Sequence, residues 1–271
     1  MTNKLKIGKI PYANLFPIFY TLQKECDCSS YEFVKGVPSA LNKMIRNNII
    51  DVSPSSSIEY LRNPSFYQII YQIIGGHSIS CKGQIGSILL FSKKKIEELH
   101  NSVIYVSSQS ETSVALLDII LKKFYGIQCK LQASQAPEDS DAEAFLLIGD
   151  EALKYSKNSL LATPYSLLTY DLGEVWYNIT GLPFVFALWI AKKNLEKSKA
   201  DLLSKFINDL NMARDVALKN LTQIAKYPPV RSFMSEDDIV SYWKRIDYNF
   251  TDKHKRGLDL FQQYLKELAY L

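Results

Sequence analysis

YDLGEVWYNITGLPFVFALWIA, residues 170–191, is the stretch from which the architecture can be built outward. Asp171 can cap a helix through its side-chain oxygen, and Glu174, three residues later, can reach back to the cap. Gly181 ends that helix. The apolar run 184–190 is too short to cross a bilayer, which needs about 20 apolar residues, so it predicts a central strand buried on both faces.

Composition places the chain among soluble globular proteins. Its 271 residues can form one large domain or two lobes, because domains usually hold roughly 100–200 residues. Hydrophobic residues make up 47% and charged residues 22%, and the net charge is only +4. The basic residues fall in short clusters, which are typical of solvated faces and argue against a nucleic-acid partner. A small organic anion remains compatible with this charge.

Several kinds of chemistry lack their sequence motifs. The four cysteines form no CxxC pair, and the three histidines form no HExxH or triad-like pattern, so no metal and no serine-hydrolase site is predicted. There is no P-loop and no GxGxxG, which predicts that no nucleotide or nicotinamide cofactor is used. No signal peptide precedes Lys4, so we expect a cytoplasmic protein with reduced cysteines and no membrane partner.

Strands and helices alternate through most of the chain, which predicts an α/β fold with mixed, mostly parallel sheets. We expect two lobes with a ligand cleft between them: residues 1–83 plus 192–271 form lobe one, and residues 84–191 form lobe two. Strands are predicted at 5–10, 31–37, 50–53, 66–74, 78–81, 85–92, 103–106, 129–131 and 144–148. Beyond the helix at 38–48 and the one ending near Tyr125, long helices are predicted at 197–225, 235–246 and 251–270.

Polar residues follow several of these strands, where open α/β sheets bind ligands. Asn14 follows the first strand, and Ser56 and Ser57 follow the third; Glu59 completes a capping-box pattern with Ser56. Similar groups occur at Gly86 and Ser87, at Ser107–Ser113, and at Gly149 and Asp150. Each also has a plain structural explanation, because Asn, Ser and Asp commonly cap helices.

Seven short segments in a fixed order carry a family resemblance: Ile10–Asn14 with Pro17, Ser56–Tyr60, Gly86–Ser92, Ser110–Ser113, Ile148–Asp150, Tyr170–Glu174 and Gly181–Ala187. Together they resemble the chorismate dehydratases of the futalosine route to menaquinone. The resemblance spans most of residues 5–191, and two places depart from it: Ala13 replaces a bulkier aliphatic residue, and residues 82–85 replace a Gly-Pro-Val pattern.

The resemblance implies a periplasmic-binding-protein type II-like fold adapted to catalysis. It also implies that water is removed from chorismate, without a cofactor, to give 3-[(1-carboxyvinyl)oxy]benzoate. The hypothesis is that Asn14 assists removal of the ring proton, with a carboxylate of the substrate as the candidate acceptor, while Asp171 is structural. The expected substrate-binding residues are Tyr12, Ser56, Ser57, Gly86, Ser87, Ser110, Thr112, Ser113, Gly149 and Asp150.

Two other classes remain open, and a third is disfavoured. A solute-binding protein would share the fold and bind an organic anion unchanged, although it normally needs export. A sister enzyme, a 1,4-dihydroxy-6-naphthoate synthase, would share the architecture but carries a different motif at residues 10–17. A regulator's effector domain would follow a DNA-binding helix-turn-helix, and only a few residues precede the first strand.

Overall fold

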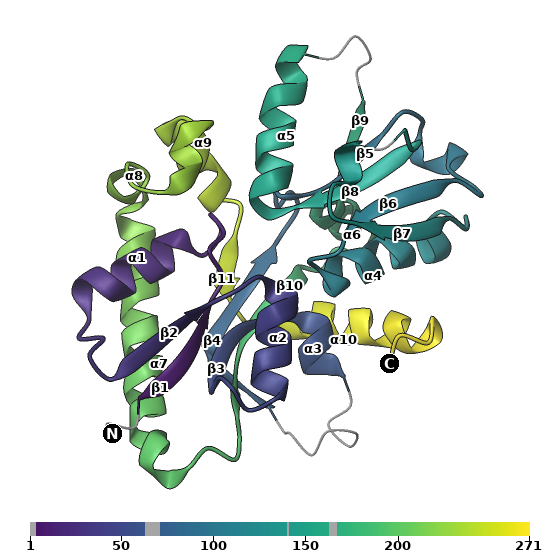
Figure 1. Ribbon diagram of the computed structural model, residues 1–271. Helices are drawn as coiled ribbons and strands as arrows, with labels where there is room; N and C mark the ends of the chain where they lie inside the picture. The colour runs from purple at the N-terminus through teal and green to yellow at the C-terminus, as the bar shows by residue number, and fades with distance from the viewer. Residues whose placement is uncertain (1–3, 63–70, 140, 163–166) are drawn as a thin grey trace. The chain divides into compact units, whose positions relative to one another are not determined.

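The computed structural model describes residues 4–62, 71–139, 141–162 and 167–271 (Figure 1). The chain folds into two compact units. The first comprises Met1–Ile79, Ala187–Lys244 and Tyr248–Phe250, and the second comprises Ser80–Phe186, Arg245–Asp247 and Thr251–Leu271. Two strands, β4 (Tyr71–Cys81) and β10 (Phe184–Lys192), contain the main crossings from one unit to the other.

A six-stranded sheet has the order β11-β4-β10-β3-β1-β2. Its other strands are β1 (Leu5–Lys9), β2 (Tyr31–Lys35), β3 (Val52–Ser56) and β11 (Asp247–Asn249). β1 pairs parallel with β2 and with β3, whereas β10 pairs antiparallel with β3. β10 therefore lies inside the sheet, and seven of its nine residues are buried, as the apolar run 184–190 predicts.

The helices of the first unit are α1 (Phe16–Glu25), α2 (Pro38–Arg46), α3 (Ser57–Leu61), α7 (Lys197–Lys219), α8 (Leu221–Ile224) and α9 (Glu236–Trp243). The single helix expected over 197–225 is wrong, because it is interrupted at Asn220. There the backbone leaves helical geometry, and the side-chain amide donates to the Val216 carbonyl at 2.8 Å. Such a side-chain bond competes with the backbone hydrogen bonds of the helix.

The second unit is built on a five-stranded mixed sheet of order β7-β6-β8-β5-β9. These strands are β5 (Ile88–Ser92), β6 (Val103–Ser107), β7 (Lys130–Ser134), β8 (Ala144–Ile148) and β9 (Leu168–Asp171). β6 pairs parallel with β7 and β8, while β5 pairs antiparallel with β8 and β9. The helical segments are α4 (Glu111–Ile119), continued by a π-helical turn at Ile120–Phe124, then α5 (Gly149–Ala162), α6 (Leu172–Thr180) and α10 (Asp252–Glu267).

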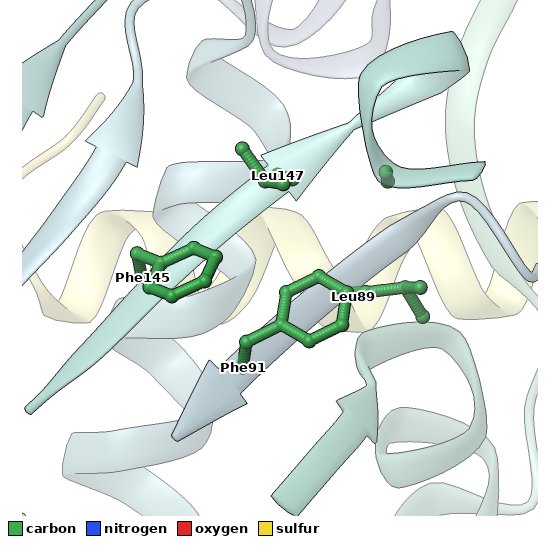
Figure 2. Packing of buried hydrophobic residues seen from close by; sticks show 5 residues of the cluster. Leu89, Phe91, Phe145 and Leu147 are labelled. Atoms are coloured by element: carbon green, nitrogen blue, oxygen red, sulfur yellow. The ribbon is translucent and has the colours of Figure 1, made fainter. Parts of the chain in front are cut away.

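Cross-strand pairs form an apolar core in this second unit. Leu89 and Phe91 of β5 are in register with Leu147 and Phe145 of β8, and Figure 2 shows the four side chains together. The Phe91 and Phe145 rings stack with centroids 5.4 Å apart. Ala152 of α5 completes the cluster, so this helix covers the sheet.

The C-terminal helix α10 packs with the second unit, whereas the expected boundaries placed it in lobe one. Phe261 packs edge-on against Phe184 and Trp176, at centroid distances of 5.0 and 6.4 Å. At Gly257 a Cβ atom would lie only 2.1 Å from the Pro183 carbonyl oxygen, so only glycine allows this approach. The pattern of residues 251–270 predicts the helix but not its partner.

Three smaller expectations also differ from the structure. The strands expected at 66–74 and 78–81 are one strand from Tyr71 onward, with Gly75 and Gly76 at φ +63° inside it; residues 66–70 lie outside the described part. The strand expected at 85–92 begins only at Ile88. The short strand β11 carries no recognisable pattern, because three residues are too few to show alternation.

The stretch 170–191 folds as expected, with one exception. Asp171 caps α6, and Gly181 ends the helix in the left-handed region at φ 67°. Glu174 does not reach back to the cap; its carboxylate instead accepts from the Gln84 amide at 3.1 Å. In the described part of the chain, no helix is long and apolar enough to cross a membrane.

His77 makes the stability of the fold depend on pH. It is buried in β4, with Nε2 2.7 Å from Oδ1 of Asn211. Burial lowers the pKa of His77 to about 4, with Arg214 acting in the same direction and Asn211 and Asp215 against it. Between pH 6.5 and 4 the unfolded chain therefore binds a proton that the folded chain does not.

We expect the free energy of unfolding to fall by about 3 kcal/mol as the pH drops from 6.5 to 4 because of this one group. Urea unfolding of the wild type and of His77→Asn across this range measures the contribution. The variant should be less stable near neutral pH and should show a shallower decline. An identical pH slope in both proteins would contradict the assignment to His77.

Candidate functional site

In the first unit, the residues expected to bind a ligand gather at one edge of the six-stranded sheet. β1 and β3 are parallel, with Ile7 opposite Val52, so their carboxyl ends lie at the same edge. Tyr12 and Asn14 follow β1. Ser56 ends β3 and Ser57 begins α3. The structure thus brings these four residues to one edge.

Asn14 does not cap the helix that follows it. Leu15 is the N-cap residue of α1, and the Leu15 and Phe16 amides donate to the Tyr12 and Ala13 carbonyls. The Asn14 side-chain oxygen Oδ1 is buried and has no hydrogen-bond partner in the described part of the chain. An unsatisfied buried amide costs stability, and such groups often serve a function. The capping explanation for Asn14 is therefore wrong.

Two buried side chains distant in the sequence hold the backbone around Asn14. Trp243 donates from Nε1 to the Ala13 carbonyl at 2.7 Å, and the Tyr248 hydroxyl donates to the Asn14 carbonyl at 2.6 Å. More than two hundred positions separate each donor from its acceptor. Sequence reasoning missed both contacts, because no local spacing connects α9 or β11 to residue 14.

The Ser56 hydroxyl is oriented by Asn42, which the sequence analysis did not single out. Asn42 is buried on α2, and its Nδ2 donates to the Ser56 oxygen at 2.8 Å. Because that oxygen accepts this bond, the hydroxyl proton is left to donate. Ser56 can therefore donate a hydrogen bond to a ligand oxygen.

The capping box expected between Ser56 and Glu59 is absent. Glu59 is buried, and its carboxylate instead pairs with the Arg46 guanidinium and accepts from the Tyr71 hydroxyl at 3.3 Å. Arg62 lies 3.7 Å away as a second cation. A buried carboxylate is stabilised far more by guanidinium groups than by a backbone amide, so it takes this partner.

In the second unit, three predicted groups meet at one edge of the five-stranded sheet. Ile88 pairs with Ile148, so the residues before β5 lie beside those after β8, and the Gly149 amide donates to the Ser87 carbonyl at 2.8 Å. β6 runs parallel to β8, which places residues 107–113 at the same edge. Gly86, Ser87, Gly149, Asp150, Ser110, Thr112 and Ser113 therefore share it.

Ser110 serves as the cap of α4. Its hydroxyl oxygen accepts from the Ser113 amide at 3.2 Å and its proton points to the Ser113 hydroxyl at 2.9 Å. Thr112 and Ser113 are buried in the first turn. The positive end of this helix dipole faces the sheet edge, which favours a negatively charged group there.

Asp171 holds two segments together. Its carboxylate accepts from the amides of Gly173 and Glu174 in α6 and from those of Ile85 and Gly86 before β5, at 2.6–3.2 Å. Burial raises the pKa of Asp171, while the four N–H groups lower it. With both oxygens occupied, Asp171 is a structural residue, as expected, and it also positions Gly86, which sequence reasoning missed.

No metal site emerges from the described residues, since no group of three His, Cys, Asp or Glu among them is arranged to hold an ion. Apart from the carboxylates of Glu111 and Asp150, the polar groups named at the two sheet edges are neutral hydroxyls, amides and backbone N–H groups. Such groups bind organic anions through oriented dipoles.

Sequence comparison connects the chain to proteins of menaquinone synthesis. Residues 5–267 match the model of a family described as "Menaquinone biosynthesis". A chorismate dehydratase of Thermus thermophilus is 27% identical over 96% of this chain and 94% of its own length. A chorismate dehydratase of Campylobacter jejuni is 31% identical over 73% of this chain and 72% of its own length.

Solved structures share the fold at low sequence identity. A protein of Archaeoglobus fulgidus has a TM-score of 0.78 at 16% identity, covering 100% of this chain and 99% of its own. The periplasmic aliphatic sulphonate binding protein of Escherichia coli has a TM-score of 0.65 at 11% identity, covering 100% and 89%. The fold is thus periplasmic-binding-protein-like, as expected.

Proposed function

The chain belongs to the menaquinone-biosynthesis family, and from this membership we propose that it is a chorismate dehydratase of the futalosine route. The observation that carries the proposal is the similarity to the Thermus thermophilus chorismate dehydratase over 96% of the chain. The enzyme is then a lyase that converts chorismate to 3-[(1-carboxyvinyl)oxy]benzoate and water.

The chemistry requires little beyond positioning. The ring carbon that bears the enolpyruvyl ether loses its proton, and the neighbouring carbon loses its hydroxyl group, so the ring becomes aromatic. The ring carboxylate acidifies that proton through the diene. An enzyme must hold the dianion rigidly, exclude water and stabilise the spreading negative charge with oriented dipoles. Neutral polar groups at the two sheet edges support this requirement.

In this proposal, Asn14 lies at the reacting carbon and assists proton removal. Its buried side-chain oxygen has no hydrogen-bond partner among the described residues, so we infer that the amide is available to a ligand. An amide is too weakly basic to accept the proton alone, because a general base should titrate near the working pH. We therefore assign the proton to a carboxylate of the substrate, with the Asn14 amide orienting it.

Substrate binding involves hydrogen-bond donors at each sheet edge. Ser56, oriented by Asn42, donates to a substrate oxygen, with Tyr12 and Ser57 beside it on the same edge. In the second unit, the amides at the start of α4 attract a carboxylate. The proposed contacts there are Gly86, Ser87, Ser110, Thr112, Ser113, Gly149 and Asp150.

Asn42→Ala tests the role of the Ser56 hydroxyl. Losing one neutral hydrogen bond is worth about 1 kcal/mol, so we expect KM for chorismate to rise about fivefold while kcat stays nearly constant. Steady-state kinetics measure both constants. Ser56→Ala should match this rise, and the double variant should add little to either. Full additivity would show that the two side chains act separately.

The direct test is to incubate the purified protein with chorismate and follow the aromatic product by chromatography and mass spectrometry. Formation of 3-[(1-carboxyvinyl)oxy]benzoate above the rate without protein supports the proposal. Binding of chorismate without turnover would indicate an anion-binding protein instead. Cleavage of a cyclised futalosine derivative, with chorismate left intact, would indicate the sister naphthoate synthase.

A further inference from the structure

The two peptide groups that flank the Asn14 Cα each accept a hydrogen bond from a buried side chain. The Ala13 carbonyl belongs to the peptide before that Cα and accepts from Trp243 Nε1 at 2.7 Å. The Asn14 carbonyl belongs to the peptide after it and accepts from the Tyr248 hydroxyl at 2.6 Å. Both are short bonds with normal geometry.

These two bonds restrict the direction of the Asn14 side chain. A residue has only two soft backbone torsions, and they are rotations of its two flanking peptide planes about the Cα. Fixing both planes fixes both torsions, and with them the direction of the Cα–Cβ bond. Within the described ranges, Oδ1 of the Asn14 amide accepts no hydrogen bond that would hold it in place. Its placement therefore depends on its backbone.

Both donors are themselves firmly held. Trp243 is fully buried at the end of α9 and lies parallel to the Phe16 ring, with centroids 6.3 Å apart. Tyr248 is 2% exposed in β11. The Ser78 hydroxyl donates to the carbonyl of the neighbouring Asn249 at 2.6 Å, and the Phe250 amide donates to the Gly76 carbonyl at 2.7 Å.

Burial favours the protonated form of the Tyr248 hydroxyl, which is the form that donates. Burial raises the pKa of its hydroxyl well above the usual value, with Tyr242 acting in the same direction. The proton therefore stays on the oxygen and in the bond to Asn14.

We propose that Tyr248 and Trp243 are positioning residues for catalysis: they hold both peptide planes of Asn14 so that its amide meets the reacting carbon. This inference rests on the proposed role of Asn14. It goes beyond that role because it explains why residues of α9 and β11 are required for a reaction performed by the loop after β1.

A purely structural role would give a different result from a positioning role. Replacing a residue that only stabilises the fold lowers the amount of folded enzyme and leaves the kinetic constants of the folded fraction unchanged. Misplacing a catalytic group by a fraction of an ångström lowers kcat and leaves ground-state binding nearly intact. The separation of kcat from KM therefore distinguishes the two.

Tyr248→Phe is the sharpest test, because it removes only the hydroxyl. Tyr31→Phe is its matched control: Tyr31 is also buried in the first unit, and its hydroxyl donates to Asp209 at the same 2.6 Å. We expect kcat to fall about 10–100-fold in Tyr248→Phe, with KM within about twofold of wild type. Tyr31→Phe should keep kcat within about twofold while losing similar thermal stability.

Two further measurements complete the test. Trp243→Phe, which removes the other donor, should lower kcat in the same way and provides the answer if Tyr248→Phe folds poorly. In an Asn14→Ala background, Tyr248→Phe should cause no further loss, because two changes that act through one group are not additive.

The outcomes separate this inference from the proposed function. Normal turnover by Asn14→Ala contradicts the catalytic role on which the inference rests. An inactive Asn14→Ala together with a fully active Tyr248→Phe contradicts the positioning role alone. Equal loss of kcat in Tyr248→Phe and Tyr31→Phe also contradicts it, because the effect would then be general.

Discussion

Asn14→Ala is expected to lower turnover of chorismate about 100–1,000-fold, which is the loss typical when a preorganised polar group at a reacting centre is removed. The substrate Kd should change less than about threefold, because the other proposed binding residues, Ser56 among them, are unchanged. The substitution removes the side-chain amide but leaves the backbone in place, because the hydrogen bonds to the Ala13 and Asn14 carbonyls do not involve the side chain.

Single-turnover kinetics and equilibrium binding of chorismate measure the two quantities separately. Asn47→Ala is a suitable control, because Asn47 is an exposed residue at the end of α2 in the same unit, and it should behave as wild type. Turnover by Asn14→Ala within tenfold of wild type would eliminate the catalytic role. An equal loss of binding and turnover would reduce Asn14 to a binding residue.

Asp171→Ala is expected to lower the free energy of unfolding by about 3–5 kcal/mol, because removing the acceptor leaves several buried N–H donors without a partner. Four amides, from Ile85, Gly86, Gly173 and Glu174, lose their partner at once. Helix α6 loses its cap, and the segment before β5 loses its attachment to it.

Urea unfolding of Asp171→Ala, followed by circular dichroism, measures this loss. Asp259→Ala provides the comparison in the same unit: Asp259 is exposed and pairs with Lys255 on α10, and such a pair is worth about 0.5 kcal/mol or less. A loss below 1 kcal/mol in Asp171→Ala would mean that water replaces the carboxylate at the four amides.

Local signals were enough to predict the elements that local forces determine. Residues 170–191 carry a capping carboxylate, a glycine at the helix end and an uninterrupted apolar run, and each feature acts within a few positions of itself. The edge location of Asn14 and Ser56 also followed, because parallel strands place their carboxyl ends together. Site residues chosen from strand ends therefore gather as expected inside each unit.

What the sequence could not predict depends on partners that are far apart in the chain. Glu59 was expected to cap a helix, yet Arg46 from the preceding helix pairs with it more favourably. Asn42 gives no signal of its own, since an asparagine on a helix is usually solvated. No local pattern connects Trp243 or Tyr248 to the loop after β1, because only the fold brings them there.

The order of strands in the six-stranded sheet has a consequence for how the chain folds during its synthesis. β3 lies between β1 and β10 in the sheet. β1 precedes β3 in the chain, but β10 is synthesised only after almost all of Ser80–Phe186 has left the ribosome. At roughly 5–20 residues per second, this delay is on the order of ten seconds. During that time the nascent chain presents an unpaired strand edge, which is a template for aggregation and a natural target for chaperones. A chain truncated before Phe184 would keep that edge open.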